Sequence, residues 1–134
     1  MEKEQNTKGY RKLIVHQKAD ELAFQTYQAT NDYPKDELFG LTSQMRRCAV
    51  SVPANIAEGY MRSGTKEKVR FYNIAQASLV ELEYYLDFSE RLGYLKGTAS
   101  KKLKELKDDT GKLLNGYIRA IRNNTGNMKQ ETGV

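Results

Sequence analysis

Apolar residues recur along this chain at spacings of three and four, the pattern of helices that bury one face. The first such stretch covers residues 13–30 and stops before Pro34, because proline disfavours helical backbone at the residue that precedes it. The sequence therefore predicts an amphipathic helix here. Its apolar face consists of Val15, Ala19, Leu22, Ala23, Thr26 and Tyr27.

The second stretch starts near Lys35 or Asp36 and continues to a turn at residues 63–64. Pro53 lies inside it, and an interior proline costs a helix about 3 kcal/mol. The apolar spacing nevertheless keeps its phase across Pro53, so we expect one long, kinked helix rather than two. Its apolar face consists of Leu38, Leu41, Met45, Cys48, Val52 and Ile56.

Two further helices follow. Thr65 is placed to cap the third one, and Gly93 is placed to end it. A short loop over residues 94–97 leads to the fourth helix, which we expect to end near Arg122. The apolar residues of the third helix are Phe71, Tyr72, Ala75, Leu79, Leu82, Leu86 and Leu92, and those of the fourth are Ala99, Leu103, Leu106, Thr110, Leu113, Tyr117 and Ile121.

Short connections between helices place consecutive helices side by side in opposite directions. We therefore predict an all-α fold, an up-down-up-down antiparallel four-helix bundle over residues 13–122. Residues 1–12 are expected to be a flexible N-terminal segment, and residues 123–134, which lack an apolar face, a disordered tail. No apolar run is long enough to span a membrane and no secretory signal is visible, so a cytoplasmic location is the default expectation.

A polar row runs along the predicted second helix beside its apolar face, within an arc of about 80°. Two interpretations are open: an ordinary solvated flank, or a half-buried hydrogen-bonded network at a helix or subunit interface. Gly59 favours a close approach at this position, and it can equally mark the helix end. The polar row consists of Gln44, Arg47, Ser51, Asn55, Glu58 and Arg62.

The predicted third helix is apolar over an unusually wide arc. Its apolar residues cover about 200°, whereas a helix with a single core face needs little more than about 100°. We therefore expect a second buried surface, formed by self-association, with Tyr72 and Phe88 among its residues. Glu81 lies within the arc and is either at its rim or buried, in which case it needs a cation such as Arg46 or Arg47.

The net charge of +5 lies entirely in residues 96–134, because acidic and basic residues balance over residues 1–95. On the predicted fourth helix, basic residues gather opposite the apolar face, although Glu105 and Asp108 share part of that side. The pattern is either a solvated face of mixed charge or a phosphate-binding surface, which needs only spaced cations. The candidate nucleic-acid-binding residues are Lys101, Lys104, Lys112, Arg119 and Arg122.

Few residues are available for catalysis or for a cofactor. The one histidine, His16, has Asp20 four residues later, and this pair is typical of a helix surface. The one cysteine, Cys48, belongs to an apolar face and is expected to be a small core residue. One Cys and one His supply no zinc-ligand spacing, and no phosphate-binding glycine motif occurs. We expect no enzyme activity, no metal and no cofactor.

Several segments of residues 13–95 match a known pattern. Residues 55–59 read Asn-Ile-Ala-Glu-Gly and follow Gln44 and Arg47 in the matching order. Further matching segments are residues 15–19, 33–37, 41–47, 77–83 and 92–95. This part of the chain resembles bacterial four-helix-bundle proteins first noticed inside intervening sequences of large-subunit ribosomal RNA genes. His16 departs from the pattern, which usually has an aromatic residue there, and the segment after Lys96 is not covered.

The family that the chain resembles is similar in fold to accessory proteins of diversity-generating retroelements. Those proteins are barrel-shaped homopentamers that bind a reverse transcriptase and nucleic acid. The resemblance implies a bundle that assembles, with a homopentamer as the expected state, and a non-enzymatic role. Two functions remain open: an oligomeric adaptor that associates with RNA or DNA and docks an enzyme such as a reverse transcriptase, or an oligomeric module that binds only protein.

Overall fold

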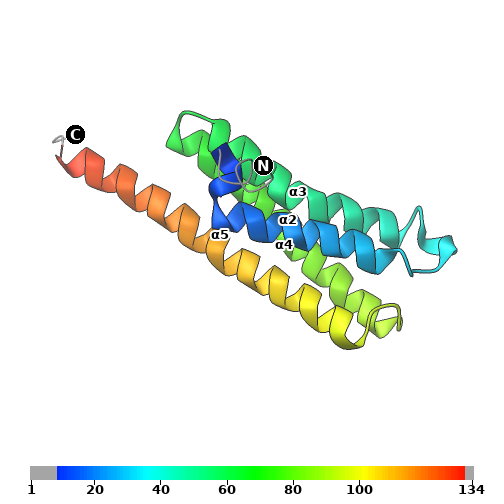
Figure 1. The fold of residues 1–134 in the computed structure, drawn as a ribbon. Coiled ribbons are helices and arrows are strands. Elements are labelled where there is room, and N and C mark those ends of the chain that lie inside the picture. Colours follow the sequence, from blue (N-terminus) through cyan, green and yellow to red (C-terminus); the bar gives the residue numbers. More distant parts are fainter. Residues whose placement is uncertain (1–8, 132–134) are drawn as a thin grey trace, which may run out of the picture.

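Four long helices form a bundle in the computed structural model, which describes the backbone of residues 9–131 and the side chains of residues 9–124. They are α2 (Ile14–Thr30), α3 (Leu41–Met61), α4 (Thr65–Arg91) and α5 (Gly97–Glu131). Each helix packs against the next, and α5 closes the ring against α2 (Figure 1). The predicted all-α four-helix bundle is confirmed. Two short 3-10 helices, η1 (Gly9–Lys12) and η2 (Lys35–Glu37), precede α2 and α3.

The buried cores of α2, α3 and α4 follow the predicted spacing closely, except that Tyr27 on α2 and Leu92 at the end of α4 are 42% and 44% exposed. On α3, every predicted apolar residue from Leu41 to Ile56 is buried, and the helix runs without a break through Pro53. The exception is Leu38, which the sequence pattern placed in this helix. It is 49% exposed, because the chain turns at Gly40, whose backbone is not helical, and α3 begins only at Leu41.

The ends of α4 show one prediction confirmed and one wrong. Gly93 stops the helix with a positive φ of 78°, and its N–H and that of Tyr94 donate to the carbonyls of Glu90 and Ser89, both at 3.0 Å. This pattern is the Schellman ending, which glycine favours because it has no Cβ. At the other end, the cap residue is Gly64, without a side-chain cap hydrogen bond, and Thr65 is already the first helical residue.

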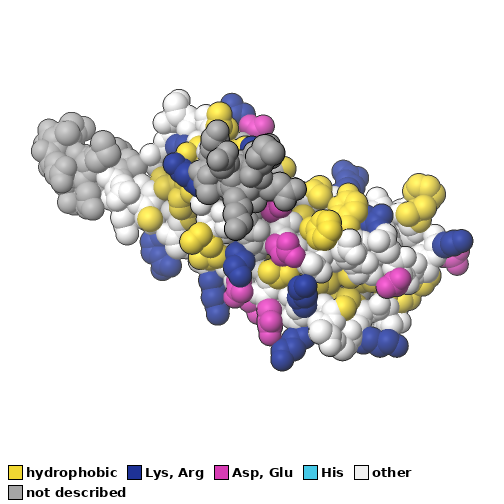
Figure 2. All heavy atoms as spheres, in the orientation of Figure 1, with side chains coloured by type: hydrophobic (Ala, Val, Ile, Leu, Met, Phe, Trp, Pro, Cys, Tyr) yellow, Lys and Arg dark blue, Asp and Glu magenta, His cyan; other side chains and the backbone are white. Residues whose placement is uncertain are grey.

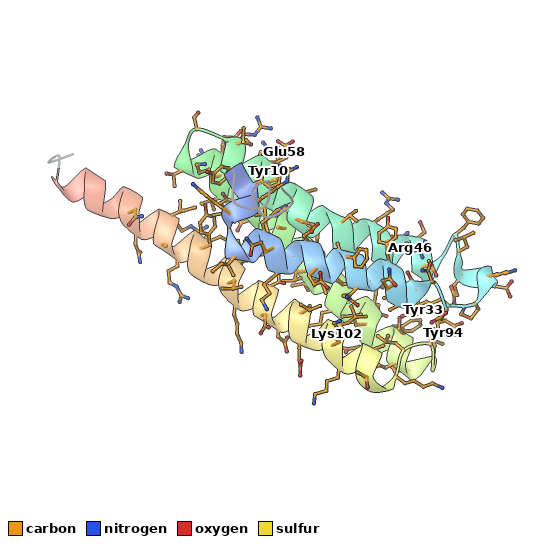
Figure 3. The ribbon with its side chains drawn as sticks, in the orientation of Figure 1. Tyr10, Tyr33, Arg46, Glu58, Tyr94 and Lys102 are labelled. Carbon is orange, nitrogen blue, oxygen red and sulfur yellow. The ribbon has the colours of Figure 1, made fainter. Side chains whose placement is uncertain are left out.

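The end of the bundle that holds both the α2–α3 and α4–α5 connections is closed by polar contacts between helices (Figures 1 and 3). At the end of α2, Arg46 of α3 donates from Nε to Thr30 Oγ1 at 2.9 Å and from Nη2 to Asn31 Oδ1 at 3.1 Å. Tyr94 O–H donates to Glu37 Oε2 at 3.1 Å. Arg46 Nη2 also donates to the Tyr27 carbonyl at 3.4 Å, one of the backbone carbonyls in the last turn of α2, where a helix leaves such groups without internal partners.

Helix α5 departs from the predicted apolar face. Leu114 and Ile118 are buried instead of Leu113, and Ala99 is exposed. From Ala99 to Leu113 the predicted positions are spaced about 3.5 residues apart on average, whereas a straight helix has 3.6 residues per turn, so the buried face drifts away from them along the helix. Thr110, in the middle of α5, belongs to both patterns and is buried.

The boundaries of the bundle also differ from the prediction. Helix α5 continues to Glu131, past the predicted end at Arg122, since adding a residue to an existing helix needs no new nucleus. The predicted disorder of residues 123–134 stays a prediction. Of the segment predicted to be flexible, residues 9–12 form η1, while residues 1–8 and 132–134 lie outside the described part of the chain. No helix in the described part combines the length and the apolarity needed to cross a membrane.

Candidate interaction surfaces

The polar row of α3 lies at the contact between α3 and α4. Ser78 of α4 donates to Ser51 Oγ at 2.8 Å. Asn55 Nδ2 donates to the Ser51 carbonyl at 2.8 Å and to its hydroxyl at 3.0 Å, and all three side chains are half-buried. The middle of the row is therefore a small hydrogen-bonded network between two helices of one chain.

The two ends of the polar row are solvated. Glu58 forms a 2.9 Å ion pair with Arg62, and both side chains are about half exposed. The Arg62 guanidinium also lies 4.7 Å from the ring centre of Phe71 on α4. Gln44 and Arg47 are exposed, and their side chains form no hydrogen bond or ion pair with another residue in the described part of the chain. The middle of the polar row is thus a half-buried network, and its ends are a solvated flank. A role of the row in a subunit interface stays a prediction.

Helix α4 carries a second, outward-facing stripe beside this row. Its members recur at spacings of four and three, the pattern by which one helix packs against another. Ile74 is 39% exposed and Tyr84 60% exposed, and the Tyr84 ring stacks on Phe88 with ring centres 6.0 Å apart. We call this set the outer stripe: it consists of Arg70, Ile74, Ala77, Glu81, Tyr84, Phe88 and Arg91.

Tyr72 is not part of any exposed surface, which corrects its predicted role at a subunit interface. Its side chain is fully buried between α3 and α5, with the Tyr117 ring centre 5.3 Å away. A Cβ added at Gly59 would lie 2.5 Å from Tyr72 Cε1, so the close approach predicted at Gly59 is made by this ring. The wide apolar arc of α4 contains both a core face and an outer face, and Tyr72 belongs to the core face.

Glu81 lies at the exposed rim, one of the two placements left open by the sequence. Arg46, one of its candidate partners, instead binds the end of α2 and lies 4.7 Å from the ring centre of Tyr27. Phe88 is half-buried and packs against the core from the outer stripe. The outer stripe therefore holds two of the three predicted α4 interface residues.

A long groove between α2 and α3 was not predicted. It consists of two adjoining hollows of about 660 and 590 Å³ that share Asp20, Glu21, Ala23 and Val50. Hydrophobic side chains are exposed over these helices (Figure 2). The sequence contains one signal for it. Val50, Ala54, Ala57 and Met61 recur at helical spacing opposite the core face of α3, and the first three line the groove. We call this the α2–α3 groove.

The groove reaches His16 and Tyr10 at one end, where the rings meet edge to face at 4.7 Å between centres. Burial lowers the pKa of His16, which Asp20 partly offsets and Arg11 reinforces. Burial, with a smaller effect of Glu81, raises the pKa of Cys48 to about 12, so this thiol stays protonated. Among the described residues, no group of three or more His, Cys, Asp or Glu side chains could hold a metal ion.

The basic residues of α5 fall into two groups. Lys101, Lys112 and Arg119 are exposed on its outer side and form no ion pair with a described residue (Figure 2 shows basic and acidic side chains along this edge). Lys104 instead contacts Glu90 and lies 3.3 Å from Asp87 of α4. Arg122 lies beside Arg119 at a shallow hollow. Lys104 is therefore already paired with acidic residues of its own chain, and it is less available to an anionic partner than Lys101, Lys112 and Arg119.

Comparison with known proteins gives one family and a solved relative. The family model described as 23S rRNA-intervening sequence protein matches residues 11–116. Among solved structures, a protein of unknown function from the S23 ribosomal protein family of Bacteroides thetaiotaomicron VPI-5482 has a TM-score of 0.71 and 24% identity. The match covers 78% of this chain and 98% of that chain, and it supports the same fold.

Comparison with curated proteins finds no match. The family match spans α2, α3, α4 and much of α5, including the polar row, the outer stripe and the α2–α3 groove. It also confirms the resemblance found in the sequence. The chain belongs to the 23S rRNA-intervening sequence protein family.

Proposed function

We propose that this protein is a non-enzymatic, homo-oligomeric adaptor of the cytoplasm that associates with nucleic acid through α5. The observation that carries the proposal is the division of its surface. The outer stripe of α4 offers an apolar surface for self-association, whereas Lys101, Lys112 and Arg119, which form no ion pair with a described residue, lie on a different helix. Assembly through α4 would therefore multiply the basic surface of α5 rather than bury it.

Self-association is supported by the exposed apolar side chains of the outer stripe. Tyr84 and Ile74 face solvent although α4 already buries a complete core face. Burying apolar area stabilises an assembly by about 25 cal/mol per Å². The resemblance to retroelement accessory proteins favours a pentamer, and it favours an enzyme such as a reverse transcriptase as a further partner.

Association with nucleic acid is supported by the spacing of the free cations. At 1.5 Å per residue, Lys101, Lys112 and Arg119 lie roughly 16 and 10 Å apart along α5. Such spaced charges suit phosphates and supply no means of reading bases. Three cations in one chain bind weakly, and several copies in one assembly act together to raise the affinity.

The test is a fluorescence-anisotropy titration of RNA and DNA oligomers at low salt. We expect binding that is independent of sequence and weakens steeply with salt, because each neutralised phosphate releases counterions. A variant with Lys101, Lys112 and Arg119 all changed to Gln should bind every oligomer more weakly. A control with Lys12, Lys35 and Lys66 changed to Gln loses the same charge from exposed positions elsewhere and should keep its affinity.

A module that binds only protein is the second candidate. One observation favours it: Lys104 and Lys107 are both engaged by acidic residues, Lys104 by Glu90 and Asp87, and Lys107 by Glu83 and Asp108. The basic face of α5 is weaker than its composition implies. An absence of binding at tens of micromolar protein would favour this second function. Equal weakening by the two triple variants would mean that binding follows net charge rather than the α5 surface.

A further inference from the structure

The outer stripe of α4 is poorly suited to pair with itself. If two copies packed their stripes in antiparallel directions about a two-fold axis, Ile74 and Phe88 would face each other across the centre. In that register Glu81 faces Glu81, and Arg70 faces Arg91. Parallel two-fold packing also sets each charged residue against its own copy. Like charges in contact oppose association, so both symmetric arrangements are disfavoured.

The α2–α3 groove has the complementary features. Ile74, Tyr84 and Phe88 of the outer stripe are large side chains that need space. The α3 side of the groove is lined by small residues, Ala54 and Ala57 among them, whereas the rings of Phe24 and Tyr27 border its α2 side. Large side chains that fill gaps between small ones give close helix packing. The two surfaces therefore match in shape, whereas two stripes would set large residues against large residues.

Most of the charges match as well, with Arg11 at one end of the groove as the exception. Asp20 and Glu21 line the groove in both of its hollows, and the outer stripe has an arginine at each end. Arg70 is exposed, with Glu67 at 3.5 Å, and so keeps access to a second carboxylate. On the groove side, Arg47 is exposed one turn from Val50 and offers a cation to Glu81. Opposite charges across a contact favour one partner and one register.

We propose that the outer stripe of α4 in one copy packs into the α2–α3 groove of a second copy, so that the protein assembles head to tail. The proposal rests on the self-association in the proposed function and names the two surfaces that meet. When two copies join through two different surfaces, the pair still has one free outer stripe and one free groove. The assembly therefore continues from copy to copy and ends only when a ring closes.

The test uses two variants that each damage one surface. A stripe variant, Ile74→Glu with Tyr84→Glu, keeps its groove, and a groove variant, Ala54→Glu, keeps its stripe. Each alone should sediment as a 15.3 kDa monomer. Mixed in equal amounts, they should form a dimer of twice that mass and nothing larger, because only one intact pair of surfaces is left. Ala120→Glu changes an exposed alanine of α5 and should assemble like the unmodified chain.

Analytical ultracentrifugation measures these masses near 100 µM protein. At that concentration a substantial share of the mixed variants should pair even if a single contact has a Kd of tens of micromolar. Circular dichroism of each variant establishes that the helices are intact. Mixed variants that stay monomeric would overturn the proposal, as would a groove variant that assembles normally. If the unmodified chain assembles, either result leaves the proposed self-association standing. A monomeric unmodified chain would overturn both.

Discussion

Gly59 and Tyr72 form a close contact between α3 and α4. The ring of Tyr72 occupies the space that a side chain at position 59 would need, with Cε1 2.5 Å from the position of an added Cβ. The sequence showed that Gly59 was unusual, since glycine weakens a helix, but it did not show which element comes close. Tyr72 lies at the border of two apolar faces, and periodicity alone did not assign it to the core.

We expect Gly59→Ala to lower the free energy of unfolding by about 1–3 kcal/mol, because the added methyl overpacks the ring of Tyr72. Gly116→Ala is the matched control: no atom lies within 4 Å of the added Cβ there. That change should raise stability by up to about 1 kcal/mol, through helix propensity. Urea unfolding measures both, and a Gly59→Ala variant as stable as the unmodified chain would contradict the contact.

Arg46 and Arg47 are neighbours with different roles. Arg46 hydrogen-bonds to Thr30 and Asn31 at the end of α2, so Arg46→Met should lower the free energy of unfolding by about 2 kcal/mol. Arg47 is exposed, and Arg47→Met should change the free energy of unfolding by less than about 0.5 kcal/mol. Thermal or urea unfolding of both variants distinguishes them. Similar losses at the two positions would mean that the bonds of Arg46 contribute little.

At the scale of helices, the sequence predicted most of α2, α3 and α4 because each buries one face at regular spacing. It misplaced Leu38, since a local turn at Gly40 does not alter the apolar pattern, and it misjudged the phase of α5. It did not reveal the α2–α3 groove, because Val50, Ala54 and Ala57 signal an outward apolar face without showing that the surface between the two helices is hollow there. The wide arc of α4 was visible, but its division into core face and outer stripe needed the packed structure.

Helices α4 and α5 are joined by a pH-sensitive contact. Hydrogen bonds from Lys104, and then from Ser100, lower the pKa of the Glu90 carboxyl below its ordinary value of 4.5. A lowered carboxyl pKa means that the contact stabilises the fold above pH 4.5 and that this stabilisation is lost as pH falls through the folded-state pKa.

Lys104→Gln should therefore lower the unfolding midpoint at pH 7 by more than it does at acid pH, where the contact is lost as Glu90 becomes protonated. Lys101→Gln removes an exposed α5 lysine that forms no ion pair with a described residue, and it should show little change with pH. Urea unfolding at the two pH values gives the comparison. A Lys104→Gln effect of the same size at both would mean that the Glu90 contact is not what stabilises the helices.

The outer stripe makes a prediction of its own. Tyr84→Glu places a charge on a side chain that is 60% exposed, so it should abolish assembly while helicity and thermal stability stay nearly unchanged. Tyr72→Glu changes a fully buried side chain and should unfold the chain instead. Circular dichroism and size-exclusion chromatography separate the two outcomes. A Tyr84→Glu variant that still assembles would place the contact elsewhere.

For the whole molecule, the central claim is that this bundle is one part of a larger assembly. Its core is complete within one chain, yet large apolar side chains remain exposed on α4 and over the α2–α3 groove. Light scattering coupled to size-exclusion chromatography at micromolar concentration measures the mass directly. We predict a discrete multiple of the 15.3 kDa chain mass, with five copies expected, and a mass of one chain would contradict the claim.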